Sequence, residues 1–140
     1  MEISASILAC DPLYLARDVK EAEMGGADII HVDIMDGQYV ENLTFGIHTV
    51  EYLSKMTGLP IDVHLEVLDP ERYIENFADA GAKMITVQLD TCRCPIRTLN
   101  TIRQYGAKAG LAINPHTGME SVEYLVDYFD FLCIFFAFPC

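Results

Sequence analysis

The sequence of 140 residues is poor in positive charge, with 9 lysines and arginines against 21 aspartates and glutamates. The formal net charge at pH 7 is therefore −12. A surface this negative repels nucleic acid and anionic lipid, so we expect neither as a partner. An anionic substrate would need a local positive site, made by backbone amides or by a metal.

Long apolar runs are also missing. The most hydrophobic segment, residues 131–139, is much shorter than the roughly 20 residues of a membrane-spanning helix. The N-terminus lacks the basic, apolar and small-residue succession of a signal peptide. The five cysteines are an odd number and show no spacing typical of a disulfide framework. We therefore expect a reduced, cytoplasmic protein with no membrane partner.

No glycine-, serine- or proline-rich linker divides the chain, so we expect one domain over residues 1–140. Short apolar runs alternate with polar stretches of helical periodicity. The expected strands are residues 3–8, 29–35, 61–67, 84–89, 109–113 and 131–137. The expected helices are residues 12–24, 47–56, 70–80, 95–105 and 119–128. Such alternation predicts an α/β fold built around a parallel sheet.

The strands begin about every 25 residues, a period typical of a repeated βα unit. A doubly wound open sheet and a closed (β/α)8 TIM barrel both contain such units. A doubly wound nucleotide-binding sheet usually carries a glycine-rich turn after its first strand, and Leu8-Ala9-Cys10-Asp11 has no glycine. The connection at residues 36–46 is long, and active sites of barrels are built from such loops. We therefore favour the barrel.

Polar side chains recur at alternate positions of the expected strands, where they share one face. The sets are Ser4 and Ser6; His31, Asp33 and Met35; Asp62, His64 and Glu66; and Thr86 and Gln88. Burying unpaired polar groups costs free energy, so these faces need partners. A metal site at the carboxyl ends of the strands would provide them, because imidazole and carboxylate bind divalent transition metals. A buried His–Asp hydrogen-bond network would provide them equally, and both interpretations stay open.

Several segments together resemble one known family. They are Ser6-Ile7-Leu8, His31-Val32-Asp33-Ile34-Met35-Asp36-Gly37, Asn42-Leu43-Thr44, Asp62-Val63-His64-Leu65, and Leu111 to Pro115 with Thr117. In this order they resemble the ribulose-phosphate 3-epimerase family, in register over most of the chain. The resemblance implies a (β/α)8 barrel that interconverts D-ribulose 5-phosphate and D-xylulose 5-phosphate in the pentose phosphate pathway.

The resemblance also implies roles for individual residues. In that family two histidines and two aspartates hold one divalent metal, which would be Zn, Fe, Mn or Co. His31, Asp33 and His64 match three of these ligands. Asp33 also matches a base that removes the C3 proton to form an enediolate, while Ser6 and His64 match substrate-binding residues. The implied partner is a small-molecule sugar phosphate, and the implied assembly is a homo-oligomer.

The sequence departs from the family pattern in several places. We expect six strands and five helices, without the last two βα units that carry the second acid and the phosphate-binding loops. Glu66 stands where the family has a methionine, and Gln88 stands where it often has a histidine. Two alternatives follow: a truncated, catalytically silent member, or a paralogue acting on D-allulose 6-phosphate. Another reaction on the same barrel, such as decarboxylation, is disfavoured because no lysine lies beside the carboxylates of the second and third strands.

Overall fold

The computed structural model describes residues 1–135. Its six strands are parallel and pair in chain order within one sheet. The strands are β1 (Ser4–Ser6), β2 (Ile29–Met35), β3 (Ile61–Glu66), β4 (Met84–Gln88), β5 (Lys108–Ile113) and β6 (Phe131–Ile134). The α-helices are α1 (Leu15–Met24), α2 (Ile47–Met56), α3 (Ile74–Asp79), α4 (Pro95–Gln104) and α5 (Met119–Glu123). Three 3₁₀ turns occur at Ile7–Ala9, Pro70–Arg72 and Leu89–Thr91.

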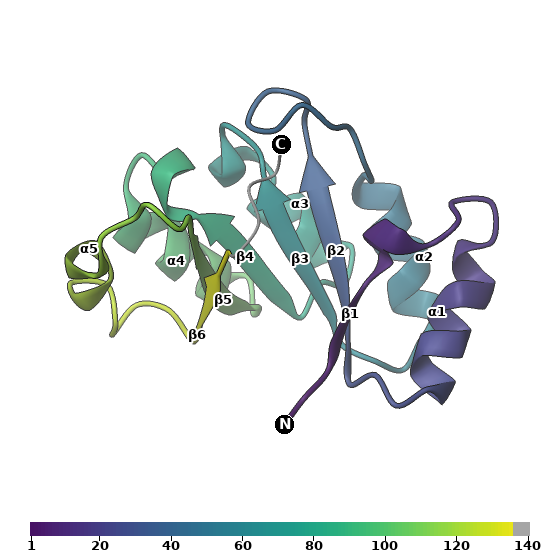
Figure 1. The fold of residues 1–140 in the computed structure, drawn as a ribbon. Helices are drawn as coiled ribbons and strands as arrows, with labels where there is room; N and C mark the ends of the chain where they lie inside the picture. Colours follow the sequence, from purple (N-terminus) through teal and green to yellow (C-terminus); the bar gives the residue numbers. More distant parts are fainter. Residues whose placement is uncertain (136–140) are drawn as a thin grey trace.

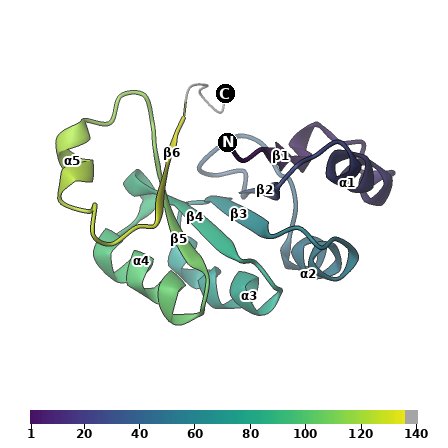
Figure 2. The same cartoon turned by 90° about the horizontal axis from the view of Figure 1, so that it is seen from below.

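The sheet is curved into an arc, with the helices along its outer side (Figures 1 and 2). A doubly wound sheet reverses its strand order near the middle and carries helices on both faces. Here the order β1 to β6 never reverses, so the expected TIM-barrel architecture of six strands and five helices is confirmed. The last expected strand was residues 131–137, of which residues 136 and 137 lie outside the described part.

Apolar side chains on the outer faces of the strands form the core with the helices. Ile61, Val63 and Leu65 of β3 alternate with polar residues and are at most 1% exposed. They belong to one cluster that includes Phe77 of α3 and Ile102 of α4. Because helices cover this face, the remaining polar residues of each strand are directed to the inner face. All six residues of β3 are buried, so its inner polar residues are buried too.

Four helices differ from their expected ranges, and α4 does so only by ending one residue early, at Gln104. The helix expected from Pro12 begins only at Leu15, since Asp11 accepts the Leu13 amide and holds a turn there. The helix expected over residues 70–80 divides into the Pro70–Arg72 turn and α3. The helix expected over residues 119–128 ends at Glu123. Within residues 1–135, the structure contains no helix with the length and apolar character needed to cross a membrane.

Candidate active site and metal centre

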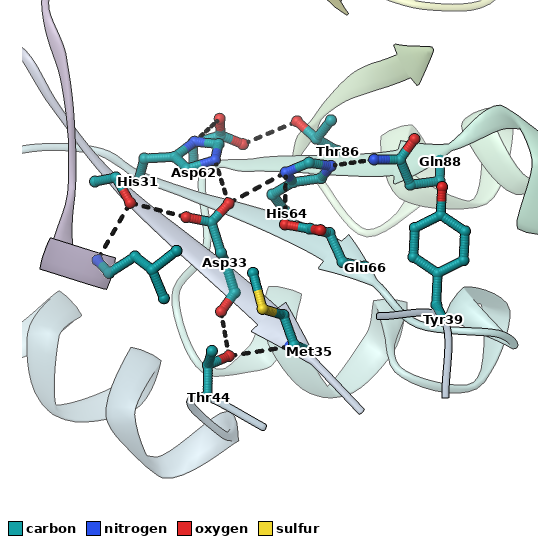
Figure 3. A network of polar contacts seen from close by, with 12 residues as sticks. His31, Asp33, Met35, Tyr39, Thr44, Asp62, His64, Glu66, Thr86 and Gln88 are labelled. Atoms are coloured by element: carbon teal, nitrogen blue, oxygen red, sulfur yellow. Dashed lines mark hydrogen bonds and ion pairs between the residues drawn. The ribbon is translucent and has the colours of Figure 1, made fainter. Parts of the chain in front are cut away.

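The pairing of β2 with β3 brings the expected site residues together. The register sets His31 opposite Asp62 and Asp33 opposite His64. Since side chains alternate along a strand, these four lie on one face of the sheet. The structure thus gathers His31, Asp33 and His64 into one cluster (Figure 3). Ser6 of β1 adjoins it through its hydrogen bond to Asp33.

Asp33 lies at the centre of this cluster. Its Oδ2 accepts a hydrogen bond from Ser6 Oγ at 2.8 Å. Its Oδ1 lies 2.9 Å from His31 Nε2 and 3.2 Å from His64 Nδ1. Burial alone would raise the pKa of Asp33, but hydrogen bonds from His31, His64 and Ser6 outweigh it and hold the pKa well below its usual range. The carboxylate is therefore ionised at neutral pH.

His31 lies between two carboxylates. Its Nε2 faces Asp33, while its Nδ1 lies 2.9 Å from Asp62 Oδ2. Burial lowers the pKa of His31, yet hydrogen bonds and charge attraction from the two aspartates raise it to about 10. A pKa raised in this way favours the imidazolium form at neutral pH, whose charge would partly neutralise the two carboxylates. Asp62 is fixed in turn by Thr86, whose hydroxyl donates to Asp62 Oδ1 at 3.1 Å.

His64 is fully buried one strand further along the sheet. Gln88 of β4 contacts its other nitrogen, with 3.1 Å between the amide Nε2 and His64 Nε2. The ring of Phe135 also lies close to it, with a centroid distance of 5.5 Å and a tilt of 60° between the rings. His64 therefore presents Nδ1 to the cluster and has its Nε2 occupied by the neighbouring strand.

Glu66 lies next to this cluster and is 1% exposed. Its Oε1 is 3.7 Å from His64 Nδ1, whereas its Oε2 has no hydrogen-bond partner among residues 1–135. Burial, with a smaller contribution from the charge of Asp33, raises the pKa of Glu66 despite the attraction of the histidines. Gln88 Oε1 is also buried without a partner in the described part. The cluster thus contains buried polar atoms that residues 1–135 leave without a hydrogen-bond partner.

The residues present fit a divalent metal. One ligand atom from each of His31, Asp33 and His64 lies within 4.8 Å of the other two. Two imidazoles and a carboxylate are a donor set that divalent transition metals accept. Asp62 on the second nitrogen of His31 would orient that ring, as outer-shell carboxylates do for metal-bound histidines. The sequence left a metal site and a hydrogen-bond network as alternatives. The structure shows the hydrogen-bond network, and the atoms that form it around Asp33 are the donors that a metal would use.

The long connection after β2 is held by side-chain hydrogen bonds near both of its ends. Near its end, the Thr44 hydroxyl donates to the Asp33 carbonyl and accepts the Met35 amide at 3.0 Å. Near its start, the Tyr39 hydroxyl donates to Asp90 at 3.2 Å and accepts from Asn114 Nδ2 at 2.9 Å. Thr44 belongs to a motif visible in the sequence, but no pattern in the sequence indicates the Tyr39 contacts. They join residues far apart in the chain.

A cleft of about 490 Å³ opens beside the cluster on the inner face. Ser6, His31 and Asp62 contribute polar groups to its wall, and Phe131 and Leu132 of β6 contribute apolar ones. The cleft is lined mainly by residues at the amino ends of the strands, and it reaches the ligand cluster at Ser6 and His31.

Comparison with known proteins identifies a matching family and similar relatives. The sequence profile of the ribulose-phosphate 3 epimerase family matches residues 2–139. The chain is 40% identical over 139 residues to a ribulose-phosphate 3-epimerase of Bacillus subtilis, covering 99% of this chain and 64% of that protein. It is 41% identical over 140 residues to a chloroplastic ribulose-5-phosphate-3-epimerase of Arabidopsis thaliana, covering 98% and 50%. The chain thus spans between half and two thirds of the length of these relatives.

Solved structures support the fold. A tryptophan synthase α-subunit of Pyrococcus furiosus superposes with a TM-score of 0.68 at 13% identity, covering 96% of this chain and 64% of the other. A dihydropteroate synthase of Xanthomonas albilineans superposes with a TM-score of 0.61 at 20% identity, covering 91% and 51%. At such low identity these structures bear on the architecture alone.

Proposed function

The chain belongs to the ribulose-phosphate 3-epimerase family, and from this we propose that it carries the metal-dependent half of a ketose-phosphate 3-epimerase site. The substrate is a small sugar phosphate, D-ribulose 5-phosphate, and the product is D-xylulose 5-phosphate. One observation carries the proposal: a buried, ionised carboxylate, Asp33, lies within hydrogen-bond distance of two imidazoles whose nitrogens converge on it.

Epimerisation at C3 requires a base that removes the C3 proton and an electrophile that stabilises the resulting negative charge. The C3 proton of a ketose lies beside a ketone and is only weakly acidic. A divalent metal held by His31, Asp33 and His64 would supply electrophilic stabilisation of the oxygens next to C3 when bound. Zn, Fe, Mn and Co all suit this donor set.

Asp33 is the residue that we assign as the base. A general base must be ionised and within reach of the proton that it removes. Its lowered pKa keeps Asp33 ionised, and the Ser6 hydroxyl fixes the direction of one carboxylate oxygen. Removal of the C3 proton by Asp33 gives an enediolate of the sugar. Ser6 lines the cleft and His64 borders the base, so we assign both to substrate binding.

Three wider assignments belong to the same proposal. We place the reaction in the pentose phosphate pathway, the protein in the cytoplasm, and the active form in a homo-oligomer. They are supported by family membership and by cysteines whose spacing is not that of a disulfide framework.

Solvent exchange at C3 tests the proposal. The 140-residue chain, loaded in turn with each of the four metals, is incubated with D-ribulose 5-phosphate in deuterated water and followed by NMR. We expect deuterium at C3, and none with the Asp33→Asn variant. D-allulose 6-phosphate, assayed in parallel, distinguishes the paralogue. Absence of exchange with every metal and both sugars would overturn the proposal and favour a catalytically silent family member.

A further inference from the structure

The proposed reaction leaves one buried charge of the site without a role. Glu66 ends β3, and its side chain is 1% exposed. Its Oε2 has no hydrogen-bond partner within residues 1–135. Leaving a buried carboxylate unpaired is costly, so a group of this kind usually pairs with a cation or binds a metal.

The position of Glu66 relates it to the metal ligands rather than to the outer core. Glu66 follows His64 by two residues on the same strand, so both side chains lie on the inner face. Its carboxylate approaches His64 on the Nδ1 side, which is the side that faces Asp33 (Figure 3).

The distance is compatible with shared coordination. With metal–ligand distances of about 2.0–2.1 Å, two donors of a tetrahedral site lie about 3.3 Å apart. Glu66 Oε1 and His64 Nδ1 are 3.7 Å apart before any metal draws them together. The pair therefore needs only a short approach to share one ion, whereas Glu66 is not among the donors that converge within 4.8 Å and must also move toward His31 and Asp33.

The charge balance points the same way. Two neutral imidazoles and the Asp33 carboxylate would leave a divalent ion with one uncompensated positive charge. A second carboxylate would make the buried site neutral, and the same ion would offset the cost of burying Glu66.

We propose that Glu66 is a further ligand of the metal, beside His31, Asp33 and His64, so that β2 and β3 together contribute four donors. This inference rests on the proposed metal site. It adds that the methionine position of the family pattern has become a coordinating position in this chain, which alters both the charge and the donor set of the centre.

Metal binding, measured without any substrate, tests this inference. The Zn²⁺ dissociation constant is obtained by competition with a chromogenic chelator, and the visible spectrum of bound Co²⁺ reports the ligand set. The variants are Glu66→Gln, which keeps the shape, and Glu66→Met, which removes the polar atoms. Glu71→Gln is the matched control, because Glu71 also has a buried, unpartnered oxygen but lies in the Pro70–Arg72 turn.

Even outer-shell partners contribute about 10- to 100-fold to metal affinity, so losing a ligand should weaken Zn²⁺ binding by more than about tenfold. Both Glu66 variants should also change the Co²⁺ spectrum, whereas Glu71→Gln should leave both readouts as in the wild type. Metal-free Glu66→Met should melt no lower than the wild type, because it removes an unsatisfied buried charge. A structural role for Glu66 predicts the opposite: a lower melting temperature with unaltered affinity.

The possible outcomes distinguish the inference about Glu66 from the proposed metal site on which it rests. If the wild type binds neither Zn²⁺ nor Co²⁺, the metal site itself is wrong, and the role of Glu66 falls with it. If the wild type binds and the Glu66 variants bind equally well with the same spectrum, the site stands and Glu66 is not a ligand. If Glu71→Gln weakens Zn²⁺ binding as much as the Glu66 variants do, the loss of affinity is not specific to Glu66 and the inference is overturned.

Discussion

Replacing Asp33 with asparagine should destabilise the inner face more than its conservative shape suggests. The carboxylate is 10% exposed and lies within hydrogen-bond distance of donors on Ser6, His31 and His64. Asparagine keeps the size and one acceptor oxygen, but it replaces the other oxygen by an amide that can only donate. All three contacts then lose the carboxylate charge, and the ring of His31 loses one of its two counter-charges.

The magnitude follows from these contacts. A hydrogen bond to a charged group contributes about 1.5–3 kcal/mol, and breaking a buried ion pair costs about 3–5 kcal/mol. Because asparagine retains one acceptor, we expect a loss near the lower bound, about 3 kcal/mol in the free energy of unfolding of the metal-free chain. Metal adds a second difference, since a ligand at 100 times its Kd stabilises by about 2.7 kcal/mol. The wild type should gain this increment with Zn²⁺, whereas the Asp33→Asn variant should not.

Urea unfolding followed by circular dichroism, with and without Zn²⁺, measures both differences. With a urea dependence of about 2 kcal/mol per molar, the midpoint of the metal-free variant should fall by about 1.5 M. Asp79→Asn is the control, because Asp79 is exposed at the end of α3 and should stay within about 0.5 kcal/mol of the wild type. A loss below about 1 kcal/mol, or equal stabilisation of wild type and variant by Zn²⁺, would refute the reasoning.

Three further predictions concern binding, pH and backbone strain. Ser6→Ala removes the hydroxyl that donates to the proposed base and lines the cleft. In steady-state kinetics, KM should therefore rise by a larger factor than kcat falls. An unchanged KM would contradict the assignment of Ser6 to substrate binding. The hydrogen bond from Arg103 lowers the pKa of Asp130 in the folded state, so this ion pair stabilises the fold at neutral pH. The stabilisation is lost as the pH falls below about 4, the usual pKa of an aspartate, and then through the lowered pKa of Asp130. Both side chains are 35% exposed, which limits the effect to about 1 kcal/mol, and Arg103→Ala should reduce the difference between urea midpoints at about pH 3 and pH 7. Gly81→Ala should lower the free energy of unfolding by more than about 1 kcal/mol, because the φ of Gly81 is 106° and a Cβ there would lie 2.7 Å from the side chain of Ser54. Gly106→Ala, where φ is 83° and no atom lies near the added Cβ, should melt at a higher temperature than Gly81→Ala. Equal losses in the two variants would contradict the strain argument.

The helices show how far local pattern determines the fold. α2, over Ile47–Met56, has the expected bounds because its apolar periodicity begins and ends with the helix. The helix expected from Pro12 begins three residues later, since the Asp11 side chain satisfies the Leu13 amide in a turn. Hydrogen bonds of this kind compete with a helical start, and their outcome depends on neighbours that a periodic pattern does not contain.

In the candidate site, too, local pattern predicts some features and leaves others undetermined. Alternation along β2 is enough to predict that His31 and Asp33 share one face of their strand, and alternation along β3 does the same for Asp62 and His64. The register that sets Asp33 opposite His64 depends on how the two strands pair, which no single strand specifies. The bond between Tyr39 and Asn114 joins residues 75 positions apart, and only the curvature of the whole sheet brings them together.

The strand order has a consequence for how the site is made. Neighbours in the sheet are also neighbours in the chain, so each strand, as it leaves the ribosome, meets its partner already in place. The polar cluster from Ser6 to Gln88 draws only on β1 to β4. Its histidines and carboxylates can therefore assemble during synthesis, before β5 and β6 are added.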